Sequence, residues 1–191
     1  ADQAVALVEP HLGAIDTVRI AVAPSRLIEA AQIASALIGL GLKVGVNVMY
    51  LSTYWGEADA LPGLSEVASN AYAVSLVDSY GACNPDQVHH SVQSITSAFP
   101  QATVGFHGHD NLGLALANSL AARAAGATIA DGTITGMGRG PGNTKTEQLL
   151  YATHPTPLDM DYVALHDAIE PFELLRNEYQ WGTNLVYMVS G

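Results

Sequence analysis

The sequence predicts an α/β protein built on a parallel sheet, and two features of the chain indicate it. Apolar runs rich in Val and Ile alternate along the chain with segments of helical spacing. The polar, glycine-rich segments follow the predicted strands rather than precede them. Strands that alternate with helices in this way form βαβ units, so we expect nearly every strand to be buried on both faces.

The predicted elements come in a regular order. The expected strands are residues 15–22, 42–50, 73–78, 103–107 and 127–131. The expected helices are residues 25–40, 58–70, 85–99 and 112–125, and the remainder to about residue 180 is expected to be helical. A closed barrel of parallel strands needs eight strands. Either this sheet is open, or three strands are missing.

Composition excludes several classes of protein. The 191 residues are 49% hydrophobic and 13% charged, which is enough apolar material for one substantial core. The net charge of −11 would repel a phosphate backbone and an anionic membrane, so neither is an expected partner. Without an apolar run long enough for a membrane span, and with Cys83 as its single cysteine, the chain suits a reducing cytoplasm. We expect Cys83 to be a buried thiol.

Two histidines follow the fourth predicted strand. His107 and His109 are two residues apart, so strand geometry places both imidazoles on one side, where they could hold one metal ion. Two solvated or hydrogen-bonded histidines would give the same string. Asp110 and Asn111 come directly afterwards and can cap the next helix.

A glycine-rich segment follows the fifth predicted strand. Residues 131–143 contain glycines and a proline that require special backbone geometry and end in Asn143, just before a further helix. Such a loop is either a plain surface connection or a place where the backbone passes close to a metal or an anion.

Taken together, these two segments resemble those of one enzyme family. The run His107-Gly-His-Asp-Asn-Leu-Gly113, followed by residues 131–138, Gly142-Asn143 and Glu147, is similar to the last two strands of the HMG-CoA-lyase-like metalloenzymes. This family includes HMG-CoA lyase, isopropylmalate and homocitrate synthases and the 4-hydroxy-2-oxovalerate aldolases. The resemblance implies a TIM (β/α)8 barrel.

The resemblance also implies a domain organisation. The family carries an Arg-Asp pair at the end of its first strand, and this sequence has no such pair. With five strands predicted, residues 1–191 are expected to hold strands four to eight of one aldolase-type barrel plus the start of its helical tail. The N-terminal strands, with the arginine and an aspartate ligand, are expected to be missing.

The resemblance assigns site residues. His107, His109 and Asn143 would ligate a divalent metal ion, with Mn²⁺ expected and Mg²⁺, Co²⁺ or Zn²⁺ also compatible. Asp78 and Ser79 match the catalytic positions beside the substrate carboxylate, to which a hydroxyl can donate a hydrogen bond. Ser79 could also be a plain turn residue between strand and helix.

The implied reaction is cleavage of a 4-hydroxy-2-oxo acid, such as 4-hydroxy-2-oxovalerate, to pyruvate and an aldehyde. HMG-CoA lyase has a catalytic cysteine in the loop after its last strand, and residues 135–139 contain none, which favours the aldolases. The alternatives are a Claisen-type enzyme that condenses an acyl-CoA with a 2-oxo acid, an HMG-CoA-lyase-like lyase, and a non-catalytic barrel remnant that acts as a binding subunit. The expected partners are a 2-oxo acid substrate, further copies of the chain in a homo-oligomer, and an aldehyde dehydrogenase as in the aldolase family.

Overall fold

Five parallel strands form one sheet. The computed structural model describes residues 1–55 and 61–189. The strands lie side by side in chain order, β1-β2-β3-β4-β5, and every neighbouring pair is parallel. Their bounds are Thr17–Val22 for β1, Lys43–Val48 for β2, Ala73–Asp78 for β3, Val104–Gly108 for β4 and Ile129–Ala130 for β5. The predicted α/β class is confirmed.

Helices connect the strands as expected. They are α1 (Asp2–Val8), α2 (Leu27–Gly39), α3 (Leu64–Asn70), α4 (Pro85–Ala98), α5 (Ala115–Ala124), α6 (Thr146–Thr153), α7 (Tyr162–Tyr179) and α8 (Leu185–Met188). The helix predicted over 58–70 begins only at Leu64, and its first predicted residues lie outside the described part of the chain. The tail is not continuously helical, because the prolines at 155 and 157 separate α6 from α7.

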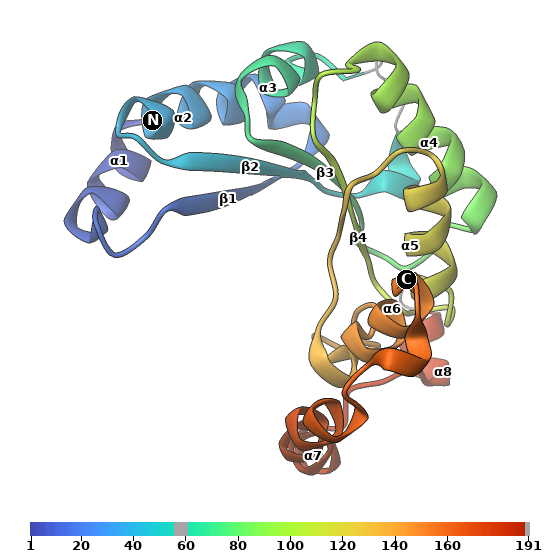
Figure 1. Ribbon diagram of the computed structural model, residues 1–191. Coiled ribbons are helices and arrows are strands. Elements are labelled where there is room, and N and C mark those ends of the chain that lie inside the picture. The colour runs from blue at the N-terminus through green and yellow to red at the C-terminus, as the bar shows by residue number, and fades with distance from the viewer. Residues whose placement is uncertain (56–60, 190–191) are drawn as a thin grey trace.

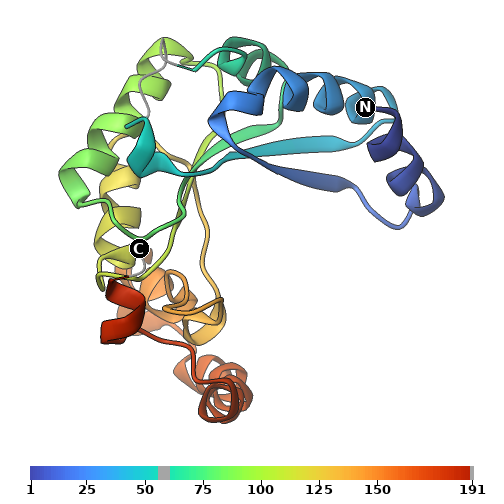
Figure 2. The ribbon, with the colours of Figure 1, turned by 180° about the vertical axis from the view of Figure 1, so that it is seen from behind.

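The core lies between the sheet and its helices. Side chains such as Val46, Leu76 and Phe106 on the strands are fully buried against the apolar faces of α2 to α5. Figures 1 and 2 show these helices on the convex side of a curved sheet, while the concave side faces away from them. Helices on one face of a curved parallel sheet are the arrangement of a TIM barrel wall.

The concave face of the sheet is only partly covered, which corrects one expectation. Buried residues run along the whole of β3, but β1 alternates, with Thr17, Arg19 and Ala21 exposed on the concave side. The prediction that nearly every strand is buried on both faces is therefore wrong for β1 and also for β5, where Ile129 is half-buried and Ala130 is exposed. Both are edge strands of an open sheet.

Local capping sets where two helices start. Asn84 and Gln87 form a reciprocal capping box at the start of α4. The carboxylate of Asp110 accepts a hydrogen bond from the backbone N–H of Ala115, the first residue of α5, at 3.0 Å, although the residue at the N-cap position is Leu114. The chain therefore leaves the ends of β3 and β4 along defined paths.

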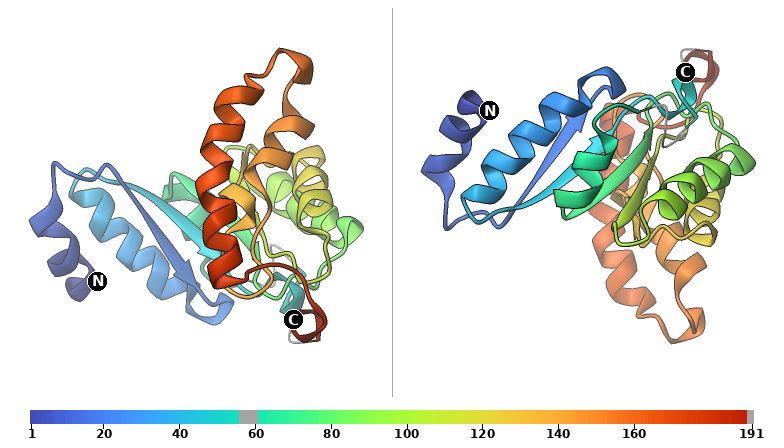
Figure 3. Two further views of the ribbon diagram at one scale, coloured as in Figure 1. Left: turned by 90° about the horizontal axis from the view of Figure 1, so that it is seen from below. Right: turned by 90° about the horizontal axis from the view of Figure 1, so that it is seen from above.

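The C-terminal helices lie beyond the carboxyl ends of the last strands. Figure 3 shows the long helix α7 from two further sides, and Figure 1 shows α6 and α7 below the end of β4. Trp181, after α7, is buried, and its indole N–H donates to the Thr135 carbonyl at 3.1 Å. This contact anchors the tail on the glycine-rich loop. Within the described residues, no helix combines the length and apolarity needed to cross a bilayer.

Candidate active site at the carboxyl ends of the strands

Polar side chains meet on the concave face towards the carboxyl ends of the strands. The register aligns Ala21 with Asn47, Asn47 with Ser75, and Ser75 with Gly105. His107 lies two residues further along β4, and Asp131 follows β5 directly. The carboxyl ends of parallel strands are where both barrels and open α/β sheets carry their active sites.

Asp131 connects the first and last strands of the sheet. Its carboxylate accepts two hydrogen bonds from Arg19 of β1, at 3.0 and 2.7 Å. Arg19 also donates to Asn47 at 2.9 Å from one guanidinium nitrogen and at 3.2 Å from another. Asp131 thus receives a two-point ion pair across the concave face, and the planar guanidinium is fixed by its partners.

The second partner of Asp131 is His107. The His107 Nδ1 lies 3.0 Å from Asp131 Oδ2. Burial acts to raise the pKa of Asp131, but hydrogen bonds from His107 and Arg19 together with the Arg19 charge outweigh it and lower the pKa to about 2. An ionised carboxylate can only accept, so His107 donates from Nδ1, and Nε2 is the ring nitrogen left to face a ligand. This is how a carboxylate orients a histidine that ligates a metal.

His109 lies beside His107 and is held neutral. The two ring centroids are 5.3 Å apart with 64° between the ring planes. Burial, and then the proximity of His107 and Arg139, lower the pKa of His109 to about 4. At neutral pH the imidazole is therefore uncharged and has a lone pair to offer. The structure brings the two predicted histidines to one place.

Asn143 pairs with His109 through the backbone. It forms an antiparallel bridge with His109, framed by backbone hydrogen bonds from Thr144 to Gly108 and from Asp110 to Gly142, both 3.0 Å. The Asn143 amide nitrogen donates to the Met137 carbonyl at 3.0 Å, while its buried Oδ1 has no hydrogen-bond partner among the described residues. A buried amide oxygen without a partner is costly unless something else occupies it, and a cation can.

Glycines allow the loop to hold Asn143 in this position. Gly142 has φ +86°, and a Cβ there would collide with the Gly136 carbonyl oxygen. Gly138 packs against the Asn143 amide with no room for a side chain. The Glu147 carboxylate accepts from the Thr135 N–H at 3.1 Å and fastens the start of the loop to α6. The glycine-rich segment therefore supports Asn143. From the sequence, it could equally have been a plain surface connection.

Asp78 and Ser79 lie at the end of β3, but on different sides of the turn. Asp78 is fully buried on the helix side, and its carboxylate accepts from the backbone N–H groups of Ala82 and Cys83, both at 3.1 Å. Burial raises its pKa against these hydrogen bonds. Ser79 accepts from the Tyr50 N–H at 2.9 Å and lines a cavity beside His109. The structure thus places Ser79 near the histidines and Asp78 inside the turn.

Cys83 is a buried thiol, as expected. It is inaccessible to solvent, and burial followed by the nearby Asp78 raises its pKa. A thiol in this state is a poor nucleophile.

Two residues of the site are not predicted from the sequence. Arg19 sits inside an apolar run, and Asp131 stands out only as the start of a loop. The available signal was periodicity, because a charged residue at an inward position of a buried parallel strand needs a partner. That partner, 112 positions away, is visible only in the fold.

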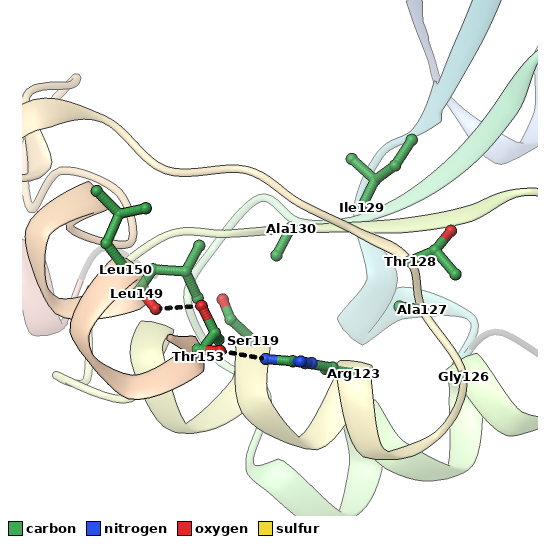
Figure 4. Close-up of a pocket in the computed structure, with 10 residues that line it drawn as sticks. All are labelled: Ser119, Arg123, Gly126, Ala127, Thr128, Ile129, Ala130, Leu149, Leu150 and Thr153. Atoms are coloured by element: carbon green, nitrogen blue, oxygen red, sulfur yellow. Dashed lines mark hydrogen bonds between the residues drawn. The ribbon is translucent and has the colours of Figure 1, made fainter. Parts of the chain in front are cut away.

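A larger cavity elsewhere has less suitable chemistry. It has a volume of about 620 Å³ and lies between α5, β5 and α6, as Figure 4 shows. Its walls are mainly apolar, and its one charged residue, Arg123, contacts the Thr153 carbonyl at 3.5 Å. None of the predicted site residues lines it, so size alone does not make it the candidate site.

Comparison with known proteins places the chain in a family. The family model described as HMGL-like matches residues 46–170, which include the end of β3, both histidines and the glycine-rich loop. The chain belongs to the HMGL-like family. This confirms the resemblance seen in the residues around His107 and Asn143.

The HMGL-like relatives include aldolases. The chain is 37% identical over 158 residues to 4-hydroxy-2-oxovalerate aldolase of Pelotomaculum thermopropionicum, covering 77% of this chain and 46% of that protein. It is 34% identical over 143 residues to oxaloacetate decarboxylase of Mycobacterium tuberculosis, covering 72% of this chain and 42% of that protein. The chain spans less than half the length of these relatives.

Solved structures agree on the fold. The N-terminal domain of a candidate aldolase from Bacteroides vulgatus matches with a TM-score of 0.91 and 40% identity, covering 100% of this chain and 64% of that one. HMG-CoA lyase of Bacillus subtilis matches with a TM-score of 0.70 at 20% identity, covering 95% and 70%. The five strands and their helices therefore have the fold of a TIM-barrel family, as predicted.

The residues present fit a divalent metal ion in three respects. Two imidazoles lie side by side, a carboxylate orients one of them, and a buried amide oxygen lacks a partner among the described residues. Nitrogen and oxygen donors of this kind suit Mn²⁺, Mg²⁺, Co²⁺ or Zn²⁺. The described residues contain no group of three His, Cys, Asp or Glu that could hold a metal ion, so this fit depends on the two histidines together with the Asn143 amide.

Proposed function

We propose that the protein is a divalent-metal-dependent aldolase that cleaves a 4-hydroxy-2-oxo acid to pyruvate and an aldehyde. The observation that carries this function is that His107 and His109 lie side by side at the carboxyl ends of the strands, with Asn143, whose side-chain oxygen has no partner among the described residues, bridged to His109 through the backbone. Aldolases among the relatives support the reaction class. A divalent cation held by these donors would polarise the substrate's 2-oxo group.

The protein's own residues would prepare this site. Asp131 would orient His107 through its Nδ1, and the hydrogen bonds from His107 and Arg19 would keep Asp131 ionised. Arg19 also supplies positive charge on the concave face, where a substrate carboxylate or an enolate oxygen would gain from it. We propose Ser79 as a substrate contact and Asp78 as the residue that holds the turn carrying Ser79.

The reaction balances without a redox partner. A base takes the proton of the 4-hydroxyl, the bond between C3 and C4 breaks, and a new carbonyl forms at C4. The electron pair stays on the three-carbon fragment, which is then protonated to pyruvate. Loss of CO₂ from oxaloacetate leaves the same fragment, so the two activities named among the relatives share their chemistry.

Further features of the whole protein are proposed with this function. Strands beyond the described sheet would close the concave face and add the arginine and aspartate of the family's first strand. We propose Mn²⁺ as the metal, a cytoplasmic location, a homo-oligomeric state and an aldehyde dehydrogenase that consumes the aldehyde.

The test is pyruvate release by the native protein that contains these residues. We expect pyruvate from 4-hydroxy-2-oxovalerate, loss of activity after exhaustive chelation, and recovery with Mn²⁺. The variant His107→Ala should be inactive, while His90→Ala, on the exposed side of α4, should behave as wild type. Turnover that survives chelation would contradict the metal. A requirement for an acyl-CoA would instead favour the Claisen-type alternative.

A further inference from the structure

A second cavity has His109 in its wall. It has a volume of about 340 Å³, and its walls include Ser79, Tyr80, His109, Arg139 and Tyr187. These residues come from the turn after β3, the end of β4, the glycine-rich loop and α8. A space of this size beside the proposed metal centre can hold the part of a substrate that leaves as the aldehyde.

Arg139 is an exposed residue of the glycine-rich loop and contributes a positive charge to the wall of this cavity. The chain has only seven lysines and arginines and a net charge of −11. Arg19, Arg26 and Arg176 each form an ion pair with a carboxylate. Among the described residues, no carboxylate lies within ion-pair distance of Arg139, although acidic residues outnumber basic ones. A guanidinium beside a cavity, with no carboxylate partner in the described part of the chain, is suited to bind an anion in two-point fashion.

Ser79 offers a second donor to the same cavity. Its oxygen accepts from the Tyr50 N–H at 2.9 Å, which leaves the hydroxyl hydrogen free to donate, and the residue is only 7% exposed. Tyr50 has a left-handed backbone with φ 64°, and its ring stacks on Tyr80 at 5.5 Å. Strained backbone is kept where the surrounding structure holds it firmly. The Ser79 hydroxyl is therefore positioned by a fixed turn.

Resting on the aldolase function above, we propose that the aldehyde part of the substrate carries a carboxylate, which Arg139 and Ser79 bind in this cavity. The 2-oxo acid end would lie at His107, His109 and Asn143, and the far end would reach Arg139 past His109. The substrate class is then a 4-hydroxy-2-oxo diacid, and the released product is an aldehyde with a terminal carboxylate. Its cleavage needs no further reactant, because the far carboxylate takes no part in bond breaking.

The test compares two acceptors in the condensation direction. Pyruvate is supplied to the native protein with Mn²⁺ and either 4-oxobutanoate or butanal, which share a four-carbon chain and differ in a terminal carboxylate against a methyl group. We expect kcat/KM for 4-oxobutanoate to exceed that for butanal by at least tenfold. Arg139→Gln should bring the ratio close to one, and Arg139→Lys should keep part of it. Arg123→Gln, in the cavity of Figure 4, should keep both the activity and the ratio of the wild type.

A separate measurement distinguishes a failure of the proposed aldolase function from a failure of the proposed carboxylate pocket. Exchange of the pyruvate methyl hydrogens with deuterated solvent, followed by NMR, needs the metal centre but no aldehyde. If this exchange is absent, the aldolase function itself fails. If exchange occurs but the wild type shows no preference for 4-oxobutanoate, or Arg139→Gln keeps the preference with an unchanged thermal transition, the carboxylate pocket is wrong. A stronger preference for a phosphorylated aldehyde would also overturn it.

Discussion

At the scale of single residues, the site depends on one carboxylate. Asp131 is bound by Arg19 from the opposite edge of the sheet and by His107 from the neighbouring strand. Its ionised state therefore fixes the tautomer of a proposed ligand and links β1 to the last strand at the same time. Removal of that charge should weaken both the fold and the metal site.

Asp131 should make stability depend on pH. Its folded pKa of about 2 lies below the ordinary 3.8, so its contribution is present above pH 4 and is lost as the pH falls towards 2. The shift corresponds to roughly 2 kcal/mol at pH 7. In urea unfolding with chelator present, Asp131→Asn should be less stable than wild type by about that amount at pH 7. The two proteins should converge near pH 2, and parallel pH profiles would contradict this role.

The three proposed ligands should differ in how they respond to substitution. His109→Ala removes a nitrogen donor and should weaken Mn²⁺ binding at least about tenfold, whereas His90→Ala should not. Asn143→Asp replaces a neutral oxygen by an anionic one and should preserve or strengthen binding, while Asn143→Ala should weaken it. Titration of the native protein with Mn²⁺, monitored by the free-ion resonance signal, measures these affinities. Equal affinities for His109→Ala and His90→Ala would remove His109 from the site.

At the scale of elements, the glycine-rich loop acts as a scaffold. It carries Asn143 across to β4, where residues 142–144 pair with residues 108–110, and Trp181 from the tail packs against its start. The loop is therefore fixed on both sides. Its glycines are needed at particular positions rather than for general flexibility.

A matched pair of glycine variants tests this. Gly142 and Gly113 both have positive φ, +86° and +70°, but a Cβ would collide with the Gly136 carbonyl at Gly142 and meet nothing within 4 Å at Gly113. Gly113→Ala should cost about 1 kcal/mol from backbone strain alone. Gly142→Ala should cost roughly 1 to 3 kcal/mol more and also weaken Mn²⁺ binding, because the loop must shift. Equal unfolding free energies for the two variants would show that the loop is loosely held.

At the scale of the whole molecule, the sheet has an open edge at β1. The edge of β1 has no neighbour in the described residues, and its concave-side residues are exposed. Exposed strand edges pair with other strands when they can. This is the basis for proposing that further strands complete a barrel around the site.

The chain of 191 residues, expressed alone, should therefore behave as an incomplete sheet. We expect it to associate, to unfold without a sharp cooperative transition and to bind Mn²⁺ weakly, because a missing anionic ligand leaves charge uncompensated. Analytical ultracentrifugation, calorimetry and metal titration measure these properties. A monomer that melts cooperatively and binds one metal ion tightly would show that the described sheet is self-sufficient.

The sequence by itself determined the order of strands and helices and the two motifs that carry the family. Alternating apolar runs predict βαβ units because periodicity is local, and the bounds of β3 agree with the prediction. His107 and His109 could be paired from their spacing, since residues two apart in a strand share a side. Asn143 was predicted as a ligand because its loop resembles the corresponding loop of the family.

Only the tertiary structure decided what surrounds these motifs. The contact of Arg19 with Asp131 joins residues 112 positions apart, and no local pattern encodes such a pair. Asp78 and Ser79 are neighbours in sequence, yet one is buried in a turn and the other faces a cavity, because side chains alternate where a strand ends. Partners, burial and charge balance follow from packing across the sheet, which is fixed only when the whole chain is folded.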